Sequence, residues 1–456
     1  MGVDYSENGF SEKGPPSMSP LVPPHIVQKQ MERLGIGAPG RASIRALSRL
    51  VNGIEAEAGV RFIRMEMGVP GLPTPKPAVD GAASALENGV SAVYPPFEGI
   101  PELKAEISRF LRLFLDVTID SDGCFPTVGA MHGCYLGMMI AGYREAFRDR
   151  ILLFEPGFPV HSQQARMLGL APTFLHIPDY RGDALGHGLE AAFSDGNVGA
   201  VVYSNPNNPS WISLTEDELA TIGRVCRRHD VIVLEDLAYI GMDFRKDYGR
   251  PGQPPFVPTA ARYTDQCLLI VSTSKVFSMA GDRIGMAAVP DGLFHREFQG
   301  LSSRFGTRRF GRALIEGGLY GTTAGVSHSS QAALLEMLKA VNSGGVDYLS
   351  VLREYGDRAK AMKAIFLRHG FRLTYPKDIL EPLADGFYFT VSYPGMAGDT
   401  LVEALLGYGI SAISLSSTGQ GVREGIRACV SQTGADRFPE LARRLSRFQR
   451  DHQALG

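Results

Sequence analysis

One lysine follows directly after a short apolar run and has hydroxyl side chains around it. Residues 268–271 lead into Ser-Thr-Ser and then Lys275, and Arg283 stands eight residues further on. A lysine beside a serine is usually a solvated loop residue. At the end of a buried strand, however, its amine is suited to forming an imine with a carbonyl compound and not to a surface ion pair.

Other polar residues follow apolar runs in the same way. Asp236 and Tyr239 come after residues 231–234, and a proline-locked turn at 205–210 comes after residues 200–203. Each has an ordinary interpretation, a helix N-cap for the aspartate and a tight turn for the prolines. Because ligands of open α/β sheets lie at the carboxyl ends of the strands, their shared position at strand ends predicts a binding cleft.

Two further segments extend this pattern. Residues 151–154 lead into Phe158 and His161, and the small residues 127–131 begin a predicted helix that reaches about residue 147. Free N–H groups and the positive end of the helix dipole favour a phosphate at such a helix N-terminus. The sequence therefore predicts a phosphate-binding helix end beside the other strand ends.

Strands and helices in alternation must position these residues. Five short apolar runs are typical of strands buried on both faces of a mostly parallel sheet: 151–154, 200–203, 231–234, 268–271 and 286–289. Between two of them, a capping box of Thr215 and Glu218 begins a helix that reaches residue 230. This order predicts an α/β layered domain. After about residue 335 the pattern predicts a smaller α+β unit with helices at 332–341, 349–366 and 436–451 and strands at 387–391 and 425–430.

The composition excludes several classes of protein. Among 456 residues the net charge is −2, which does not favour a nucleic-acid partner or an anionic membrane. No apolar run of about 18 residues predicts a membrane span. The five cysteines are scattered without a CxxC spacing, which indicates reduced thiols in a cytoplasmic protein and neither a disulfide framework nor a metal site.

Together these motifs resemble the fold-type I pyridoxal-phosphate enzymes, specifically the class I/II aminotransferase family. The resemblance covers about residues 67–430, and its most specific parts are the Asn-Pro-x-Asn-Pro turn, Asp236-x-x-Tyr239, and Ser-x-Ser-Lys275 with Arg283. It implies pyridoxal 5'-phosphate as cofactor. It also implies a large domain with a mostly parallel seven-stranded sheet flanked by helices, and a smaller α+β domain.

The expected domain organisation has four parts. Residues 1–25 are rich in proline, serine and glycine, which predicts a disordered or strapping arm. The remaining parts are an N-terminal segment of the small domain at 26–80, the large cofactor-binding domain at 81–335 and the C-terminal small domain at 336–456.

The resemblance gives the residues around the cofactor ring specific roles. Lys275 would hold the cofactor as an internal aldimine and then move a proton between substrate and cofactor. Asp236 would pair with the pyridine nitrogen and keep it protonated, with His161 behind it. Asn208 and Tyr239 would hydrogen-bond the 3-oxygen of the ring.

Other residues would hold the face of the ring and the phosphate. Phe158 occupies the position of the aromatic residue that stacks on the ring. Tyr94 matches a tyrosine that family members lend to the phosphate of the neighbouring subunit, which implies a homodimer with shared active sites. The remaining phosphate-binding residues implied by the resemblance are Gly129, Ala130, Met131, Ser272, Ser274 and Arg283.

The substrate end depends on Arg427, which matches the arginine that grips the substrate α-carboxylate through a bidentate fork. Gly68 matches a glycine whose backbone approaches the same carboxylate, and Asn208 also belongs to the expected substrate site. The chain departs from the family pattern at residues 69 and 71, at Asp282 and in segment 414–419, which lacks the usual proline–glycine loop. These departures leave cofactor binding intact but indicate an unusual substrate pocket.

The leading hypothesis is an aminotransferase that moves an amino group from an L-amino acid to a 2-oxo acid by a ping-pong mechanism. A lyase, a decarboxylase or an enzyme like aminocyclopropane-carboxylate synthase would share the same lysine and aspartate. Arg427 disfavours decarboxylation because its grip retains the carboxylate. A non-catalytic ligand-sensing regulator is disfavoured because residues 1–60 show neither a helix-turn-helix pattern nor a basic balance.

The amino acid that the enzyme uses stays open. Four arginines lie in the region where dicarboxylate-specific relatives carry a second arginine: Arg304, Arg308, Arg309 and Arg312. A solvated basic helix face is the preferred interpretation of this cluster, because the local motif does not align with that of such relatives.

Overall fold

A seven-stranded sheet forms the centre of the larger part of the molecule. The computed structural model describes residues 20–379, 381–419 and 421–452. The strand order is β2-β8-β7-β6-β5-β3-β4, and within this sheet β8 runs antiparallel to both of its neighbours while the other pairs are parallel. The strands are β2 Cys124–Thr127, β3 Arg150–Glu155, β4 Ala171–His176, β5 Val198–Ser204, β6 Ile232–Leu237, β7 Cys267–Ser272 and β8 Gly285–Ala288. The predicted α/β fold with a mostly parallel sheet is confirmed.

Two strands of the sheet are missing from the sequence prediction. Strands β2 and β4 contain Pro126 and Pro172, which interrupt the apolar pattern. Both strands lie at the edges of the sheet, where a residue without a backbone N–H is tolerated. The five strands between them coincide with the five predicted apolar runs.

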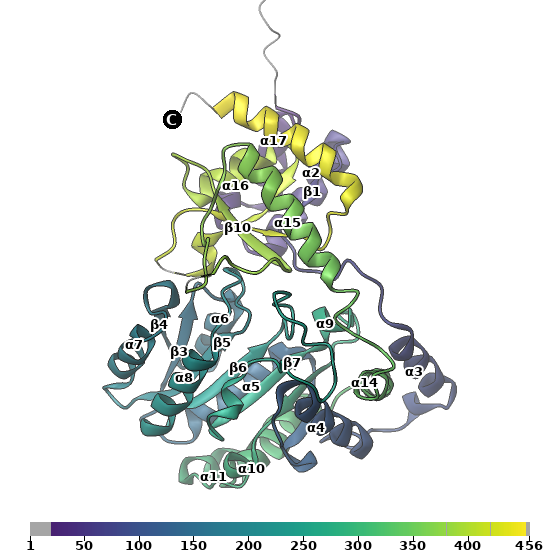
Figure 1. Cartoon of the computed structure of the whole chain (residues 1–456), viewed down its shortest axis with the longest axis vertical. Coiled ribbons are helices and arrows are strands. Elements are labelled where there is room, and N and C mark those ends of the chain that lie inside the picture. Colours follow the sequence, from purple (N-terminus) through teal and green to yellow (C-terminus); the bar gives the residue numbers. More distant parts are fainter. Residues whose placement is uncertain (1–19, 380, 420, 453–456) are drawn as a thin grey trace, which may run out of the picture.

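Helices cover both faces of the sheet (Figure 1). Helix α5, Gly129–Tyr143, packs against β5, β6, β7 and β8, and α8, Glu216–Arg228, packs against β6. Successive side chains of β6 alternate between two hydrophobic clusters: Leu234 joins the cluster that contains α5, and Val233 joins the cluster that contains α8. Such burial on both faces explains why the strands are continuous apolar runs.

The predicted capping box is present at the start of α8. The side chain of Thr215 accepts a hydrogen bond from the backbone N–H of Glu218, and the Glu218 carboxylate accepts one from the backbone N–H of Thr215. The other helices of the larger part are α3 Lys76–Glu87, α4 Pro101–Leu115, α6 Pro159–Met167, α7 Ala184–Phe193, α9 Thr273–Val276, α10 Asp291–Phe294, α11 Gln299–Phe305, α12 Phe310–Arg312, α13 Tyr320–Thr323 and α14 His328–Asn342, with a π-helix at Ala313–Leu319.

The smaller part joins segments from both ends of the described chain. Figure 1 shows α2 and β1, in purple, beside the yellow-green α16 and the yellow α17. A four-stranded antiparallel sheet has the order β12-β13-β10-β9, and β1 pairs in parallel with β11. The elements are α1 Pro24–Leu34, α2 Ile44–Ala58, β1 Ile63–Arg64, α15 Arg353–Arg368, β9 Arg372–Leu373, β10 Tyr388–Ser392, α16 Gly398–Leu406, β11 Ile410–Ser411, β12 Ile413–Ser414, β13 Ile426–Cys429 and α17 Phe438–His452.

We propose on these pairings that residues 26–80 and 336–456 form the small domain and residues 81–335 the large domain. Helix α14 runs across the proposed boundary near residue 335 and packs against α3 and α4. Most of the expected arm, residues 1–19, lies outside the described residues. Next to it, Val22 is buried, and its backbone N–H donates to the carbonyl of Gly407 at 2.9 Å.

Two sets of polar contacts hold the smaller part against the sheet. The buried carboxylate of Asp378 accepts hydrogen bonds from Arg181 at 3.3 Å and from Arg245 at 2.7 Å. The backbone N–H of Gly157 donates to the carbonyl of Thr418 at 2.8 Å. In the described part of the chain, no helix is both long and apolar enough to cross a membrane.

Glu235 is a carboxyl group buried inside the sheet. Its Oε2 accepts hydrogen bonds from Thr259 Oγ1 at 2.5 Å and from the backbone N–H of Ala260 at 3.1 Å. Burial raises the pKa of Glu235 to about 7, although these hydrogen bonds act in the opposite direction. The pKa of Glu235 thus lies above its usual value of 4.5. Its contribution to stability is therefore fully present below about pH 4.5 and is lost as the pH rises through about 7.

Replacing Glu235 by glutamine should remove this pH dependence, because the amide stays neutral at every pH. As the pH rises from about 5 to about 8.5, the free energy of unfolding of Glu235→Gln is expected to increase by about 1–3 kcal/mol relative to that of wild type. Urea unfolding of both proteins at the two pH values measures the change. A difference between variant and wild type that is the same at both pH values would contradict the proposed titration.

Candidate active site

Lys275 lies at the carboxyl end of β7, where the strand passes into the short helix α9. Ser272 caps this helix, and its Oγ accepts a hydrogen bond from the backbone N–H of Ser274 at 3.3 Å. Thr273 Oγ1 donates to the carbonyl of Ile284 at 2.6 Å, which ties the turn to β8. The local chain is therefore fixed on both sides of the lysine.

The surroundings of Lys275 favour an uncharged amine. Burial lowers the pKa of its ammonium group below the usual range. Arg283 and Arg427 lower this pKa further, whereas interactions with Cys429 and Asp236 raise it. A neutral amine can act as a nucleophile or accept a proton, as the sequence prediction requires.

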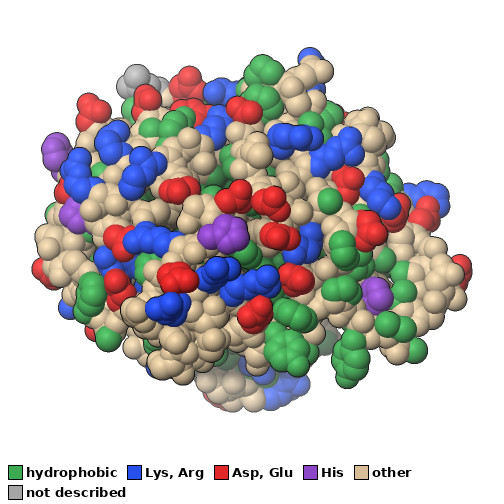
Figure 2. Space-filling view, turned by 90° about the horizontal axis from the view of Figure 1, so that it is seen from below, with side chains coloured by type: hydrophobic (Ala, Val, Ile, Leu, Met, Phe, Trp, Pro, Cys, Tyr) green, Lys and Arg blue, Asp and Glu red, His purple; other side chains and the backbone are tan. Residues whose placement is uncertain are grey.

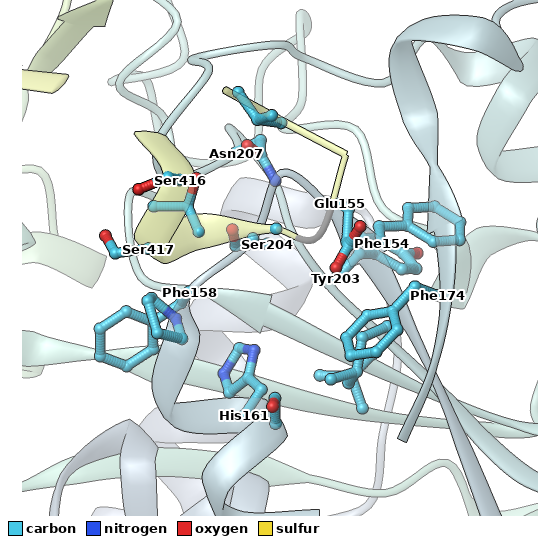
Figure 3. A pocket seen from close by; sticks show the side chains of 18 of the residues that line it. Phe154, Glu155, Phe158, His161, Phe174, Tyr203, Ser204, Asn207, Ser416 and Ser417 are labelled. Carbon is cyan, nitrogen blue, oxygen red and sulfur yellow. The ribbon is translucent and has the colours of Figure 1, made fainter. Parts of the chain in front are cut away.

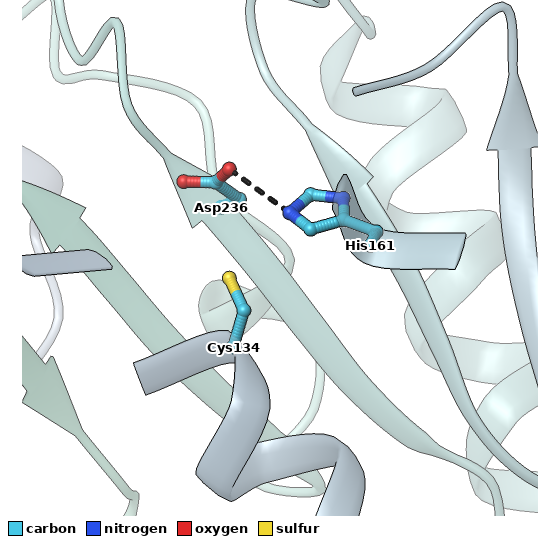
Figure 4. A group of neighbouring side chains, drawn as sticks. All are labelled: Cys134, His161 and Asp236. Carbon is cyan, nitrogen blue, oxygen red and sulfur yellow. Dashed lines mark ion pairs between the residues drawn. The ribbon is translucent and has the colours of Figure 1, made fainter. Parts of the chain in front are cut away.

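Asp236 and His161 face each other at the carboxyl ends of the strands (Figure 4). Asp236 lies near the end of β6, and its Oδ2 is 3.5 Å from Nε2 of His161. The second carboxylate oxygen, Oδ1, is buried and has no hydrogen-bond partner among the described residues. A buried carboxylate oxygen needs a donor, and the protonated pyridine nitrogen of pyridoxal phosphate would supply one.

Cys134 lies beside this pair in the same view. The ligand atoms of Cys134, His161 and Asp236 all lie within 4.8 Å of one another, a grouping that could hold a metal ion. However, burial and the neighbouring Asp236 raise the pKa of the Cys134 thiol well above its usual range. Without a metal the thiol therefore stays protonated, and the unpartnered Oδ1 of Asp236 is the group in this cluster that requires a donor.

The segments predicted to bind the phosphate meet around Gly129, the first residue of α5. Gly129 has φ +70°, and a Cβ atom there would lie 2.7 Å from Nη2 of Arg283. Arg283 is itself held by a hydrogen bond from Nη1 to the carbonyl of Ala280 at 2.9 Å. The helix N-terminus at Ala130 and Met131 thus lies next to a guanidinium group, which is a suitable cradle for a phosphate.

Arg427 is buried on β13, close enough to Lys275 for their charges to interact. Its Nη1 donates to Oδ1 of Asn208 at 3.2 Å and its Nη2 to the carbonyl of Glu66 at 2.6 Å. Nε of Arg427 has no partner among the described residues. A Cβ atom on Gly68 would lie 1.9 Å from Oη of Tyr388, whose ring lies 4.3 Å below the Arg427 guanidinium. Arg427 therefore contacts Asn208 directly, and Tyr388 contacts Arg427 and lies against Gly68.

A cavity of about 880 Å³ lies next to Phe158 and His161 (Figure 3). The ring of Phe158 meets the His161 ring edge-on, with 5.4 Å between their centroids. Phe154, Phe174 and Tyr203 form an aromatic part of the cavity wall, and Ser416 and Ser417 of the smaller part approach from the other side. Residues 416–419, within the segment that lacks the usual proline–glycine loop, thus line an open space.

Tyr94 and the four arginines lie outside this cluster. The side chain of Tyr94 is 91% exposed, in the connection before α4. Arg304 lies over the ring of Tyr143 at 3.9 Å. The other three arginines form ion pairs with surface carboxylates: Arg308 and Arg309 with Glu297, and Arg312 with Glu316. These contacts favour the interpretation of a solvated basic face.

Three residues of the site are absent from the sequence prediction: Cys134, Trp211 and Tyr388. Cys134 could have been found because it lies about one helical turn after the phosphate-binding residues of α5. Trp211 directly extends the Asn-Pro turn and is the one tryptophan of the sequence. Tyr388 lies in a predicted strand, but its contacts with Arg427 and Tyr239 arise only in the folded chain.

A half-buried lysine, a carboxylate oxygen without a hydrogen-bond partner and an arginine beside a helix N-terminus lie together at the carboxyl ends of the strands, an arrangement that fits a pyridoxal-phosphate enzyme. The sequence profile of the family described as "Aminotransferase class I and II" matches residues 61–445, and the chain belongs to this family. The enzymes of this family use pyridoxal phosphate, so the predicted cofactor is confirmed.

Several curated relatives have related sequences. Aspartate aminotransferase of Bacillus subtilis is 26% identical over 232 residues, which are 51% of this chain and 57% of that protein. Asparagine–oxo-acid transaminase of Streptococcus mutans is 24% identical over 334 residues, 73% of this chain and 76% of that protein. The chain thus spans little more than half of the length of the aspartate aminotransferase that it matches.

Solved structures share the fold. Thermus thermophilus aspartate aminotransferase with maleate has a TM-score of 0.72 at 18% identity, and the superposition covers 91% of this chain and 98% of that one. A Pyrococcus protein has a TM-score of 0.73 at 19% identity, with 94% and 99% covered. At these identities the likeness establishes the architecture.

Replacing Gly129 by alanine should weaken cofactor binding. The new Cβ would displace the Arg283 guanidinium, and a left-handed backbone costs a residue other than glycine about 1–2 kcal/mol. The dissociation constant for pyridoxal phosphate is expected to rise about tenfold or more, measured by titrating the cofactor into apoprotein.

Gly281→Ala is the matched control for this variant. Gly281 lies in the loop that leads to Arg283, a Cβ there would meet no atom within 4 Å, and its φ is not positive. Its cofactor affinity should stay within about twofold of wild type. Equal losses of cofactor affinity in the two variants would contradict the proposed cradle, because the effect would then not depend on the contact between Gly129 and Arg283.

Proposed function

We propose that the chain is an aminotransferase that moves an amino group from an L-amino acid to a 2-oxo acid by a ping-pong cycle. The observation that carries this proposal is that Lys275 lies close enough to Arg427 and to Asp236 for their charges to interact. Family membership supports the reaction class. The names of the relatives place aspartate and asparagine among the first donors to test.

The residues of the chain hold the cofactor from several sides. Bound pyridoxal phosphate supplies an electron sink for the bond electrons released at the substrate Cα. In our proposal, Oδ1 of Asp236 accepts the pyridine N–H, and His161 orients the carboxylate through its other oxygen. Phe158 covers one face of the ring, and Tyr239 and Asn208 reach its 3-oxygen.

The phosphate has its own set of ligands in this proposal. Arg283 would pair with it, and backbone N–H groups at the N-terminus of α5 would donate to it. The phosphate ligands of the chain are Gly129, Ala130, Met131, Ser272, Ser274 and Arg283.

Lys275 and Arg427 perform the substrate chemistry. Arg427 binds the α-carboxylate through its guanidinium fork, exchanging part of its present contacts with Asn208 and Glu66 for the ligand. Gly68 allows the backbone to come close to the same carboxylate. The amine of Lys275, whose pKa is lowered, would take the proton from the substrate Cα. Because Arg427 retains the carboxylate, proton transfer is favoured over loss of carbon dioxide.

We also propose a homodimer in which Tyr94 reaches the phosphate of the partner subunit. Tyr94 is 91% exposed and lies next to Val93, which is 58% exposed. Further large apolar side chains are exposed on the elements nearby: Val79, Leu86 and Tyr320. Such a concentration of exposed apolar residues fits an interface between two copies of the chain. By contrast, the lower face of the large domain in Figure 2 carries interspersed positive and negative side chains. A cytoplasmic location is proposed because all five cysteines are free and buried.

The first test follows the spectrum of the bound cofactor during a half-reaction without any oxo acid. The visible absorption, expected near about 420 nm, should decay and an absorption near about 330 nm should appear when the right amino acid is added. The amino acid with the fastest decay identifies the donor. Lys275→Ala should slow this conversion by at least about 10³-fold, because the proton-transferring amine is gone.

The products separate this function from its rivals. Release of ammonia, sulfide or carbon dioxide in place of the spectral conversion would identify a lyase or a decarboxylase. Borohydride reduction followed by peptide mass spectrometry should find the cofactor attached at Lys275. Attachment at another lysine would refute the role given to this residue.

A further inference from the structure

A buried aromatic cluster links Tyr239, a proposed cofactor ligand, to Arg427, the proposed ligand of the substrate carboxylate. It consists of Trp211, Tyr239 and Tyr388, all at most 4% exposed. Trp211 meets Tyr239 edge-on at 5.3 Å and Tyr388 at 6.1 Å, and the two tyrosine rings are 5.4 Å apart. The three residues come from the Asn-Pro turn, from the end of β6 and from β10, so the cluster joins the larger and the smaller part of the molecule.

Tyr388 makes two different contacts within this arrangement. Its hydroxyl is 3.0 Å from the hydroxyl of Tyr239, which donates a hydrogen bond to it. Its ring lies 4.3 Å from the guanidinium carbon of Arg427, a cation–π contact. One side chain thus touches both the proposed ligand of the cofactor 3-oxygen and the proposed ligand of the substrate carboxylate.

The surrounding backbone makes room for these contacts. A Cβ atom on Gly68 would lie 1.9 Å from the Tyr388 hydroxyl, and a Cβ on Gly386 would lie 2.1 Å from the Trp211 ring. Trp211 itself has φ +65°, a conformation that is strained for a bulky residue. The surrounding structure holds this strain, since the backbone N–H of Trp211 donates to the Asn207 carbonyl at 2.9 Å. Strain of this kind in a site is a reason to look for a functional role.

We propose that Tyr388 is a positioning residue that links the two ends of the site, its hydroxyl orienting Tyr239 and its ring supporting Arg427. This inference rests on the proposed function, because the roles of Tyr239 and Arg427 belong to it. Tyr388 itself touches neither the cofactor nor the substrate in the proposed arrangement and acts through Tyr239 and Arg427.

The number of protons in the pair determines how the link works. A tyrosine hydroxyl has one proton to donate. When Tyr239 donates its proton to the 3-oxygen of the cofactor, the oxygen of Tyr239 becomes available to accept the proton of Tyr388. Burial raises the pKa of Tyr388 to about 12, so its hydroxyl keeps that proton. Hydrogen bonds in such a chain strengthen one another, and Tyr388 makes Tyr239 a better donor.

Tyr388→Phe removes the hydroxyl and keeps the ring. A weaker donor at Tyr239 leaves the 3-oxygen more basic, so the proton shared with that oxygen is lost at higher pH. We expect the pH midpoint of the visible absorption of the bound cofactor to rise by about half a unit, the size of one net hydrogen bond or less. In a Tyr239→Phe background the same substitution should produce no further shift, because the link is already broken.

A merely structural role of Tyr388 would give a different pattern. Equal shifts in both backgrounds, or no shift in either, would overturn the proposal. Tyr348→Phe is the matched control, because Tyr348 is also buried and its hydroxyl has no partner among the described residues. Its midpoint and kinetic constants should equal those of wild type.

The ring contact is tested separately by comparing two variants. Tyr388→Leu removes the ring below Arg427 and should raise KM for the amino acid about fivefold, whereas Tyr388→Phe should leave KM within about twofold of wild type. Equal KM values in the two variants would overturn the second half of the proposal, and cofactor stoichiometry and circular dichroism confirm that each variant is folded. The titration also separates this inference from the proposed function. If wild-type protein shows the visible absorption but converts no amino acid, the proposed function fails. The pH midpoint of the absorption in Tyr388→Phe would still test the link between Tyr388 and Tyr239.

Discussion

The whole site depends on one constraint of parallel β-structure, which is that neighbouring strands end at the same edge of a sheet. The register makes this concrete: Ser204 at the end of β5 lies opposite Asp236 on β6, and Leu237 at the end of β6 lies opposite Val271 on β7. Each strand is followed by a different turn, and each turn carries a different functional group. The antiparallel β8 returns the chain so that Gly285 lies opposite Ser272, and Arg283 comes back to the same edge.

A consequence of this convergence is an excess of positive groups in the cleft. Lys275 interacts with Arg283 and Arg427, and the carboxylate of Asp236 is the main negative charge near them. Two guanidinium groups beside an amine whose pKa is already lowered are costly to bury without anions. A phosphate at one end and a carboxylate at the other would offset this cost, so the electrostatics of the chain already match the charges of cofactor and substrate.

Much of this arrangement follows from the sequence, and the exceptions have physical causes. Lys275 and Asp236 could be placed because buried parallel strands are continuous apolar runs with clear ends. The two edge strands escaped prediction because Pro126 and Pro172 break the pattern, which only the edge position permits. Tyr388 could be placed in a strand but not in the site, because its neighbours Tyr239 and Arg427 are distant in sequence. No local pattern encodes such contacts between parts of the fold.

The aromatic cluster also makes the chain its own optical reporter. Trp211 is the single tryptophan of the sequence, it is buried, and its ring meets that of Tyr239. All tryptophan emission of the protein therefore originates beside Tyr239 and Tyr388, with no tryptophan background from elsewhere in the chain. A cofactor chromophore bound beside Tyr239 would quench that emission by energy transfer. Any separation of the two parts of the molecule would also alter the emission. The intrinsic fluorescence of this protein thus reports on events at its active site and not on the average state of the fold.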